Sequence, residues 1–83
     1  MTSSAQKIVV IPDSEITEDT RLGIYVKARG GRQHRIAECS FTSLGLCLST
    51  LYAEEQINPG QRVGIFDRLE RHWLVNPHAR GAA

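Results

Sequence analysis

The sequence predicts a small α+β domain in which one amphipathic helix packs on one face of a mostly antiparallel β-sheet. Two segments have the pattern of β-hairpins, one segment has helical periodicity, and a chain of 83 residues supports a single core. Hydrophobic residues make up 41% of the chain and charged residues 23%, which is ordinary globular usage. We therefore expect one domain over residues 1–83, with flexible tails at 1–6 and 77–83 and about five strands in the order β-β-β-α-β-β.

The first expected strand is the β-branched run "KIVVI" at residues 7–11, which ends at Pro12. Such an apolar run is typical of a strand that is buried on both faces. Residues 12–20 contain turn formers and acids, and this composition favours a loop. One helical turn capped by Asp13 or Ser14 is the alternative.

Residues 21–39 predict a β-hairpin. Leu22, Ile24 and Val26 alternate with Gly23, Tyr25 and Lys27, as in a strand with one buried face. The following "RGGR" indicates a tight connection, because glycine adopts positive φ at little cost. Residues 33–39 then form the returning antiparallel strand.

Residues 40–57, "SFTSLGLCLSTLYAEEQI", predict the helix. Ser40, Thr42 or Ser43 can cap its start, and "NPG" at 58–60 ends it. Gly45 costs about 1 kcal/mol relative to alanine in a helix, so it indicates a close approach to the sheet or to a second chain. Leu46 lies off the apolar stripe and is expected to be exposed. The stripe itself consists of Phe41, Leu44, Cys47, Leu48, Leu51 and Tyr52.

Residues 62–77 predict a second hairpin. Val63 and Ile65 alternate with Gly64 and Phe66, "DRLER" forms the turn, and Trp73 shares a face with Val75. Pro77 ends the pairing.

Positive charge is concentrated in "KARGGRQHR" at residues 27–35, although the formal net charge of the chain is only +1. No acid interrupts this stretch, and the predicted hairpin would project its cations together from one rigid tip. The bland interpretation is a solvated tip that protects a sheet edge. The functional interpretation is a binding site, to which the second hairpin adds two arginines. The expected contact residues are Lys27, Arg29, Arg32, His34, Arg35, Arg68 and Arg71.

The leading functional hypothesis is a non-catalytic regulatory or inhibitory module that binds an acidic surface on another protein. The size is that of many bacterial and phage accessory proteins. The alternative is a nucleic-acid-binding protein that grips phosphates with the same hairpin, but a near-neutral chain without aromatics beside its arginines argues against it. A small ribonuclease using Arg32, His34 and Arg35, joined by His72 if the two hairpins lie side by side, is a further alternative.

Other chemistries lack a motif. The candidate ligands His34, Cys39, Cys47, His72 and His78 do not have zinc-site spacing, and there is no phosphate-binding loop or nucleophile elbow. We therefore expect no enzyme activity, no cofactor and no metal.

Cysteine content and hydropathy favour the cytoplasm. Two cysteines are too few for a disulfide framework, so two free thiols are expected. A single disulfide between Cys39 and Cys47 is the alternative. No segment resembles a signal peptide or a membrane span. A homodimer is expected, either by continuation of the sheet at residues 7–11 or by pairing of helices at Gly45.

Overall fold

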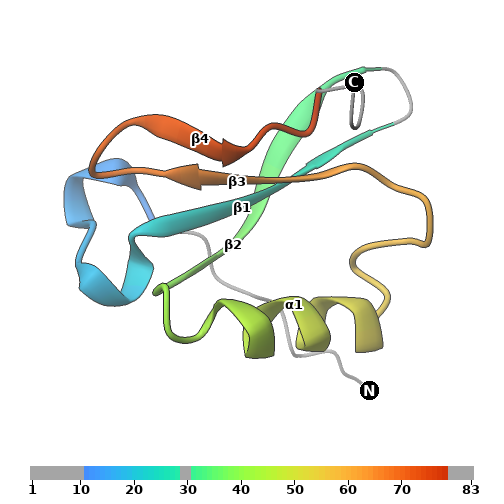
Figure 1. The fold of residues 1–83 in the computed structure, drawn as a ribbon, viewed down its shortest axis with the longest axis horizontal. Coiled ribbons are helices and arrows are strands. Elements are labelled where there is room, and N and C mark those ends of the chain that lie inside the picture. The colour runs from blue at the N-terminus through green and yellow to red at the C-terminus, as the bar shows by residue number, and fades with distance from the viewer. Residues whose placement is uncertain (1–10, 29–30, 79–83) are drawn as a thin grey trace.

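The computed structural model describes residues 11–28 and 31–78, which form a four-stranded antiparallel sheet with one helix on one face (Figure 1). This arrangement confirms the α+β class. The spatial order of the strands is β2-β1-β3-β4. The expected strand at 7–11 falls on residues outside the described part except for Ile11, which belongs to no strand, so five strands are not confirmed. The elements are β1 (Leu22–Lys27), β2 (Gln33–Cys39), α1 (Leu44–Ala53), β3 (Val63–Asp67) and β4 (His72–Val75).

The segment before β1 is more regular than the loop we expected. It contains two 3₁₀ turns, η1 (Asp13–Glu15) and η2 (Glu18–Thr20). Thr17 caps η2, because its hydroxyl accepts from the amide of Asp19 at 3.2 Å while its own amide donates to the Thr20 hydroxyl at 2.8 Å. This reciprocal cap satisfies amides that a short turn otherwise leaves without partners.

Both expected hairpins are present. β1 pairs with β2 from Leu22 opposite Cys39 to Lys27 opposite Gln33, with a bulge where Ile36 is the extra residue. β3 pairs with β4 in the second hairpin. Because β1 and β3 are themselves antiparallel neighbours, the two hairpins point in opposite directions. We call the end with the β1–β2 connection the tip end, and the end with the β3–β4 turn at residues 68–71 the turn end.

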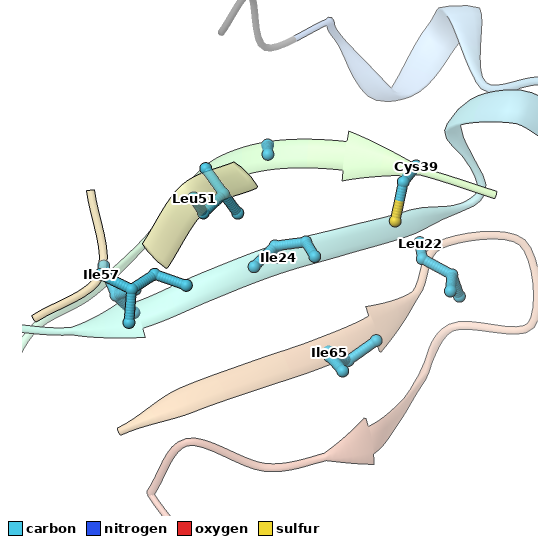
Figure 2. Packing of buried hydrophobic residues seen from close by; sticks show 8 residues of the cluster. Leu22, Ile24, Cys39, Leu51, Ile57 and Ile65 are labelled. Carbon is cyan, nitrogen blue, oxygen red and sulfur yellow. The ribbon is translucent and has the colours of Figure 1, made fainter. Parts of the chain in front are cut away.

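The core lies between α1 and the inner face of the sheet (Figure 2). Leu22 and Ile24 of β1 are fully buried, as is Leu51 of α1. Burial of such side chains, at about 25 cal/mol per Å² of apolar surface, is the main stabilising contribution available to a chain of this size. The other buried apolar members of this cluster are Val26, Ala37, Cys39, Ile57 and Ile65.

The helix is shorter than the expected 40–57. It ends at Ala53, and Glu55 has a φ of 61°, which the helix cannot accommodate. The helix also starts later than expected, at Leu44, so Phe41 precedes it and is 48% exposed. Tyr52 lies within α1 but is 50% exposed, so neither aromatic residue belongs to the buried stripe. Leu46 is 73% exposed, as expected.

The start of the helix differs from the expected side-chain cap. Ser43 occupies the N-cap position without a capping hydrogen bond, and the Ser40 hydroxyl accepts from the Ser43 amide at 3.2 Å in the turn before it. The expected close approach of Gly45 to the sheet is wrong, since no atom of the described residues lies within 4 Å of a Cβ placed there.

The outer face of the sheet carries a second, aromatic layer. Tyr25 and Phe66 each pack edge-on against Trp73, with ring centroids 5.1 and 5.0 Å away. Pro77, at which we expected a flexible tail to begin, is fully buried. Its ring covers Gly64, where any Cβ would overlap it. Gly64 is therefore required for the chain after β4 to fold back over β3.

Candidate functional site

Two of the seven expected contact residues, the half-buried Arg35 and the buried Arg68, direct their side chains to the segment before β1. Their side chains cross the outer face at Gly23, where a Cβ would stand 3.2 Å from the Arg35 Cδ and 3.3 Å from the Arg68 Cδ. These separations are tighter than ordinary van der Waals contact. The glycine in β1 thus provides the space through which both arginines reach the segment before β1.

Asp13 and Ile11 receive these two guanidinium groups. The Asp13 carboxylate accepts from Arg68 Nη2 at 2.9 Å and from Arg35 Nη1 at 3.1 Å. The Ile11 carbonyl accepts from both arginines at 3.0 Å. Arg68 also donates to the Thr20 carbonyl at 3.1 Å. The Arg68 side chain is only 2% exposed, so it is a buried brace rather than a contact residue.

Glu38 completes this arginine network from the β2 side. Its carboxylate is 3% exposed, lies 3.2 Å from Arg35 Nε, and accepts from the Ile11 amide at 3.0 Å. Burial raises the pKa of Glu38, although the Ile11 amide and the two arginines oppose this shift. The pKa of Asp13 is lowered instead, because it accepts hydrogen bonds from Arg68 and Arg35.

Asp67 organises the β3–β4 turn beside this network. Its buried carboxylate accepts from Arg21 Nε at 2.9 Å, from the Leu69 amide at 3.1 Å and from the Glu70 amide at 3.0 Å. The hydrogen bonds from Arg21 lower the pKa of Asp67. Arg71, another expected contact residue, is exposed at this turn with a φ of 61°.

Lys27, Arg32 and His34 lie at the tip end. Arg32 and His34 are exposed and Lys27 is half-buried. The connection is closed by hydrogen bonds from the Ala28 amide to the Arg32 carbonyl at 2.7 Å and from the Gly31 amide to the Ala28 carbonyl at 2.9 Å. Arg29 lies outside the described residues. The structure therefore supports a compact tip for the cations that it describes.

Arg62 joins these cations and was missed by the sequence analysis. The Lys27 amide donates to the Arg62 carbonyl at 3.0 Å, which brings the residue before β3 beside the end of β1. The only signal for this proximity is the pairing of β1 with β3, because the two residues are far apart in sequence. We define the basic tip as Lys27, Arg32, His34 and Arg62.

The basic tip differs from the arginine network in its partners. All nine Asp and Glu residues lie in the described part of the chain, and within it no carboxylate is closer than 4.0 Å to Lys27, Arg32 or Arg62. The positive charge of the tip is thus available to solvent or to a partner.

The two hairpins do not bring their basic residues together. His34 lies opposite Val26, near the tip end. His72 pairs with Asp67, which in turn pairs with Leu22, so His72 lies at the turn end. At about 3.3 Å per residue and about 4.8 Å per strand, these histidines are separated by roughly 13 Å along the sheet and roughly 14 Å across it. His72 is therefore separated from the Arg32 and His34 of the ribonuclease hypothesis, and Arg68 and Arg71 do not supplement the tip.

The two thiols lie at the turn end, where Cys39 and Cys47 are free and line one cavity of about 310 Å³. Burial raises the pKa of Cys39 to about 12 and also raises that of Cys47. Among residues 11–28 and 31–78 no three His, Cys, Asp or Glu side chains are grouped to hold a metal ion. Within the same ranges no helix is long and apolar enough to cross a bilayer.

Comparison of the chain with protein-family models, with curated proteins and with solved structures finds no match in any of the three. The functional argument therefore depends on the geometry of the tip.

Proposed function

We propose that this protein is a non-catalytic regulatory or inhibitory module whose basic tip binds an acidic surface on a partner protein. The observation that carries the proposal is the gathering of Lys27, Arg32 and Arg62, from separate segments, at one end of the sheet, where no carboxylate of residues 11–28 and 31–78 pairs with them. Charge complementarity of this kind sets association rate and specificity. A reducing cytoplasmic setting, in keeping with the two free thiols, is part of the proposal.

The distribution of acids supports a defined orientation of binding. Exposed Glu15, Glu18 and Asp19 precede β1 at the turn end, and exposed Glu70 lies in the β3–β4 turn. The same turn also holds the exposed Arg71, and two further acids, Glu54 and Glu55, are exposed after α1. The acids before β1 and in the β3–β4 turn therefore favour approach of an acidic partner through the tip, although the net charge of the chain is close to zero.

A pull-down with charge-reversed variants tests this function. The immobilised protein should retain an acidic partner that the double variant Arg32→Glu, Arg62→Glu loses. Arg71→Glu is the matched control, because it reverses an exposed arginine at the opposite end of the sheet. Equal retention by the wild type and the double variant would reject the basic tip as the contact.

The aromatic layer favours nucleic acid as the second candidate partner. Tyr25, Phe66 and Trp73 are only partly buried and lie on the outer face of the sheet, an arrangement on which unpaired bases can stack. A mobility-shift assay on single-stranded DNA and RNA at two salt concentrations distinguishes the candidates. A complex that weakens with salt and is lost in Trp73→Ala would support this second function over the first.

Self-association through β4 is a separate proposal. β2 and β4 are the two edges of the sheet formed by the described residues, and β2 carries Arg35 and Glu38, whereas β4 has no Asp, Glu, Lys or Arg. Leu74 and Val75 of β4 are 43% and 50% exposed. An uncharged apolar edge favours pairing with a second copy. Sedimentation equilibrium should show dimers that Val75→Lys dissociates, and a monomer at high concentration would reject this arrangement.

A further inference from the structure

A cavity opens at the tip end between β1 and the loop that leads into β3. Its volume is about 360 Å³, and its lining consists of Lys27, Asn58, Pro59, Gly60 and Gln61. Among residues 11–28 and 31–78 no carboxylate lines it, and Arg62 follows Gln61 directly in the chain. We call this cavity the tip pocket. Its lining combines one cation with amide groups, which are hydrogen-bond donors suited to an anionic oxygen.

The wall formed by residues 58–61 is a tight turn. Pro59 and Gly60 occupy its centre, the φ of Gly60 is +85°, and the Gln61 amide donates to the Asn58 carbonyl at 3.0 Å. Proline at the second position and a positive φ at the third are the features of a type II turn. The turn is thus fixed by local chemistry before any ligand arrives.

The Gln61 side chain joins this turn to β1. Its Oε1 accepts from the Asn58 amide at 3.0 Å, and its Nε2 donates to the Lys27 carbonyl at 3.5 Å. The hydrogen bond between the Lys27 amide and the Arg62 carbonyl holds the same strands together on the other side of Gln61. Both walls of the tip pocket are therefore held in place, and such preorganisation lowers the entropic cost of binding.

Three donor groups of the lining stay available once Gln61 is used. They are the Lys27 ammonium group, the Asn58 carboxamide and the Gly60 amide, none of which donates a hydrogen bond within residues 11–28 and 31–78. Lys27 is half-buried as a residue, which places its side chain against the cavity rather than fully in solvent. A hydrogen bond from a charged donor to an anionic oxygen is stronger than one between neutral groups.

We propose that the tip pocket receives the side-chain carboxylate of an aspartate or glutamate from an acidic segment of the partner. This inference rests on the proposed function and names the point at which the partner is anchored. The carboxylate pairs with Lys27 and accepts from the Asn58 carboxamide and the Gly60 amide. Arg32 and Arg62 contact neighbouring acids of the same segment.

A nuclear magnetic resonance titration with capped hexaglutamate tests the anchor, and hexaglutamine is the uncharged control peptide. Hexaglutamate should shift the backbone amide signals of Lys27, Gly60 and Gln61. Lys27→Gln should weaken its binding about tenfold, Lys27→Arg should restore most of it, and Asn58→Ala should weaken it severalfold. Arg71→Gln removes a distant exposed charge and should leave the affinity unchanged. Dispersed spectra of each variant verify that it is folded.

The outcomes separate the tip pocket from the proposed function. Binding of hexaglutamate that shifts only signals of residues 31–35, with full affinity in Lys27→Gln, would overturn the anchor while the basic tip remains the contact. A second titration with inorganic phosphate completes the test. Shifts at Lys27 and Gly60 with phosphate but not with hexaglutamate would show an anion site that does not take acidic segments, which overturns both the carboxylate assignment and the proposed function. Absence of any shift with either probe also overturns both.

Discussion

Arg68 and Arg62 stand at the two ends of the same strand and are used in opposite ways. Arg68 follows β3 at the turn end, is 2% exposed and binds Asp13 together with two backbone carbonyls. Arg62 precedes β3 at the tip end, is exposed, and has no carboxylate partner in the described residues. Arg68 acts as a structural brace because Gly23 leaves space for its side chain to reach Asp13. Arg62 stays available for binding because its neighbours at the tip end carry amide groups and no carboxylate.

The largest expected effect is that of Arg68→Ala on stability. The substitution leaves the buried Glu38, Asp13 and the carbonyls of Ile11 and Thr20 without this guanidinium group, and it should lower the free energy of unfolding by about 3 kcal/mol. Arg62→Ala is the matched control and should change it by less than about 0.5 kcal/mol. Urea denaturation measures both, and similar losses in the two variants would remove the distinction between the ends.

The next effect is that of Asp67→Asn. The substitution weakens the hydrogen bonds from Arg21 and from the Leu69 and Glu70 amides, so it should cost about 2 kcal/mol and loosen the β3–β4 turn. Urea denaturation measures the loss, and hydrogen exchange of the Leu69 and Glu70 amides locates it. Unchanged exchange at these amides would contradict the role of Asp67 in the turn.

Acid should weaken the turn end through the same carboxylate. The pKa of Asp67 in the folded protein lies below its ordinary value of 3.8, so its contribution to stability is complete above that value and is lost as the pH falls through the folded pKa. Glu38 acts in the opposite sense, because its raised pKa favours folding at low pH and this contribution disappears as the pH rises through the folded pKa. The urea concentration at the unfolding midpoint of the wild type should therefore decrease when the pH is lowered below about 4. Those of Asp67→Asn should fall less steeply.

A smaller effect should appear in the reactivity of Cys39. Burial raises the pKa of Cys39 to about 12, so less of this thiol is ionised at pH 8 and it should react with iodoacetamide about tenfold more slowly than an exposed thiol. Opening of the turn end by Arg68→Ala should accelerate the reaction, whereas Arg62→Ala should not. Peptide mass spectrometry distinguishes Cys39 from Cys47. Equal rates in the wild type and Arg68→Ala would show that the arginine network does not protect this thiol.

The elements that the sequence predicts well are those set by local patterns. Alternation at Leu22, Ile24 and Val26 predicts β1, and the two glycines before Arg32 predict the connection to β2. The apolar stripe predicts that the helix exists but not where it ends. The chain turns at Glu55 with a positive φ, and no glycine at that position indicates the turn in the sequence. Local chemistry therefore predicts where the elements are better than where they stop.

The candidate site is predicted only in part, because charge runs do not show which cations meet acids in the fold. Arg35 lies inside the basic run but faces Asp13 and Glu38, and Gly23 makes room for it only because β1 lies between β2 and β3. Arg62 enters the tip through the same non-local pairing. Sheet order is the missing information in both cases.

The contact between Gly64 and Pro77 has an evolutionary consequence. A side chain at position 64 and a proline ring above it cannot occupy the same space, so the two positions are not independent. In any distant homologue, we expect replacement of the glycine to coincide with loss or displacement of the proline. This pair of positions would then be a covariation marker by which relatives with divergent tips can be identified.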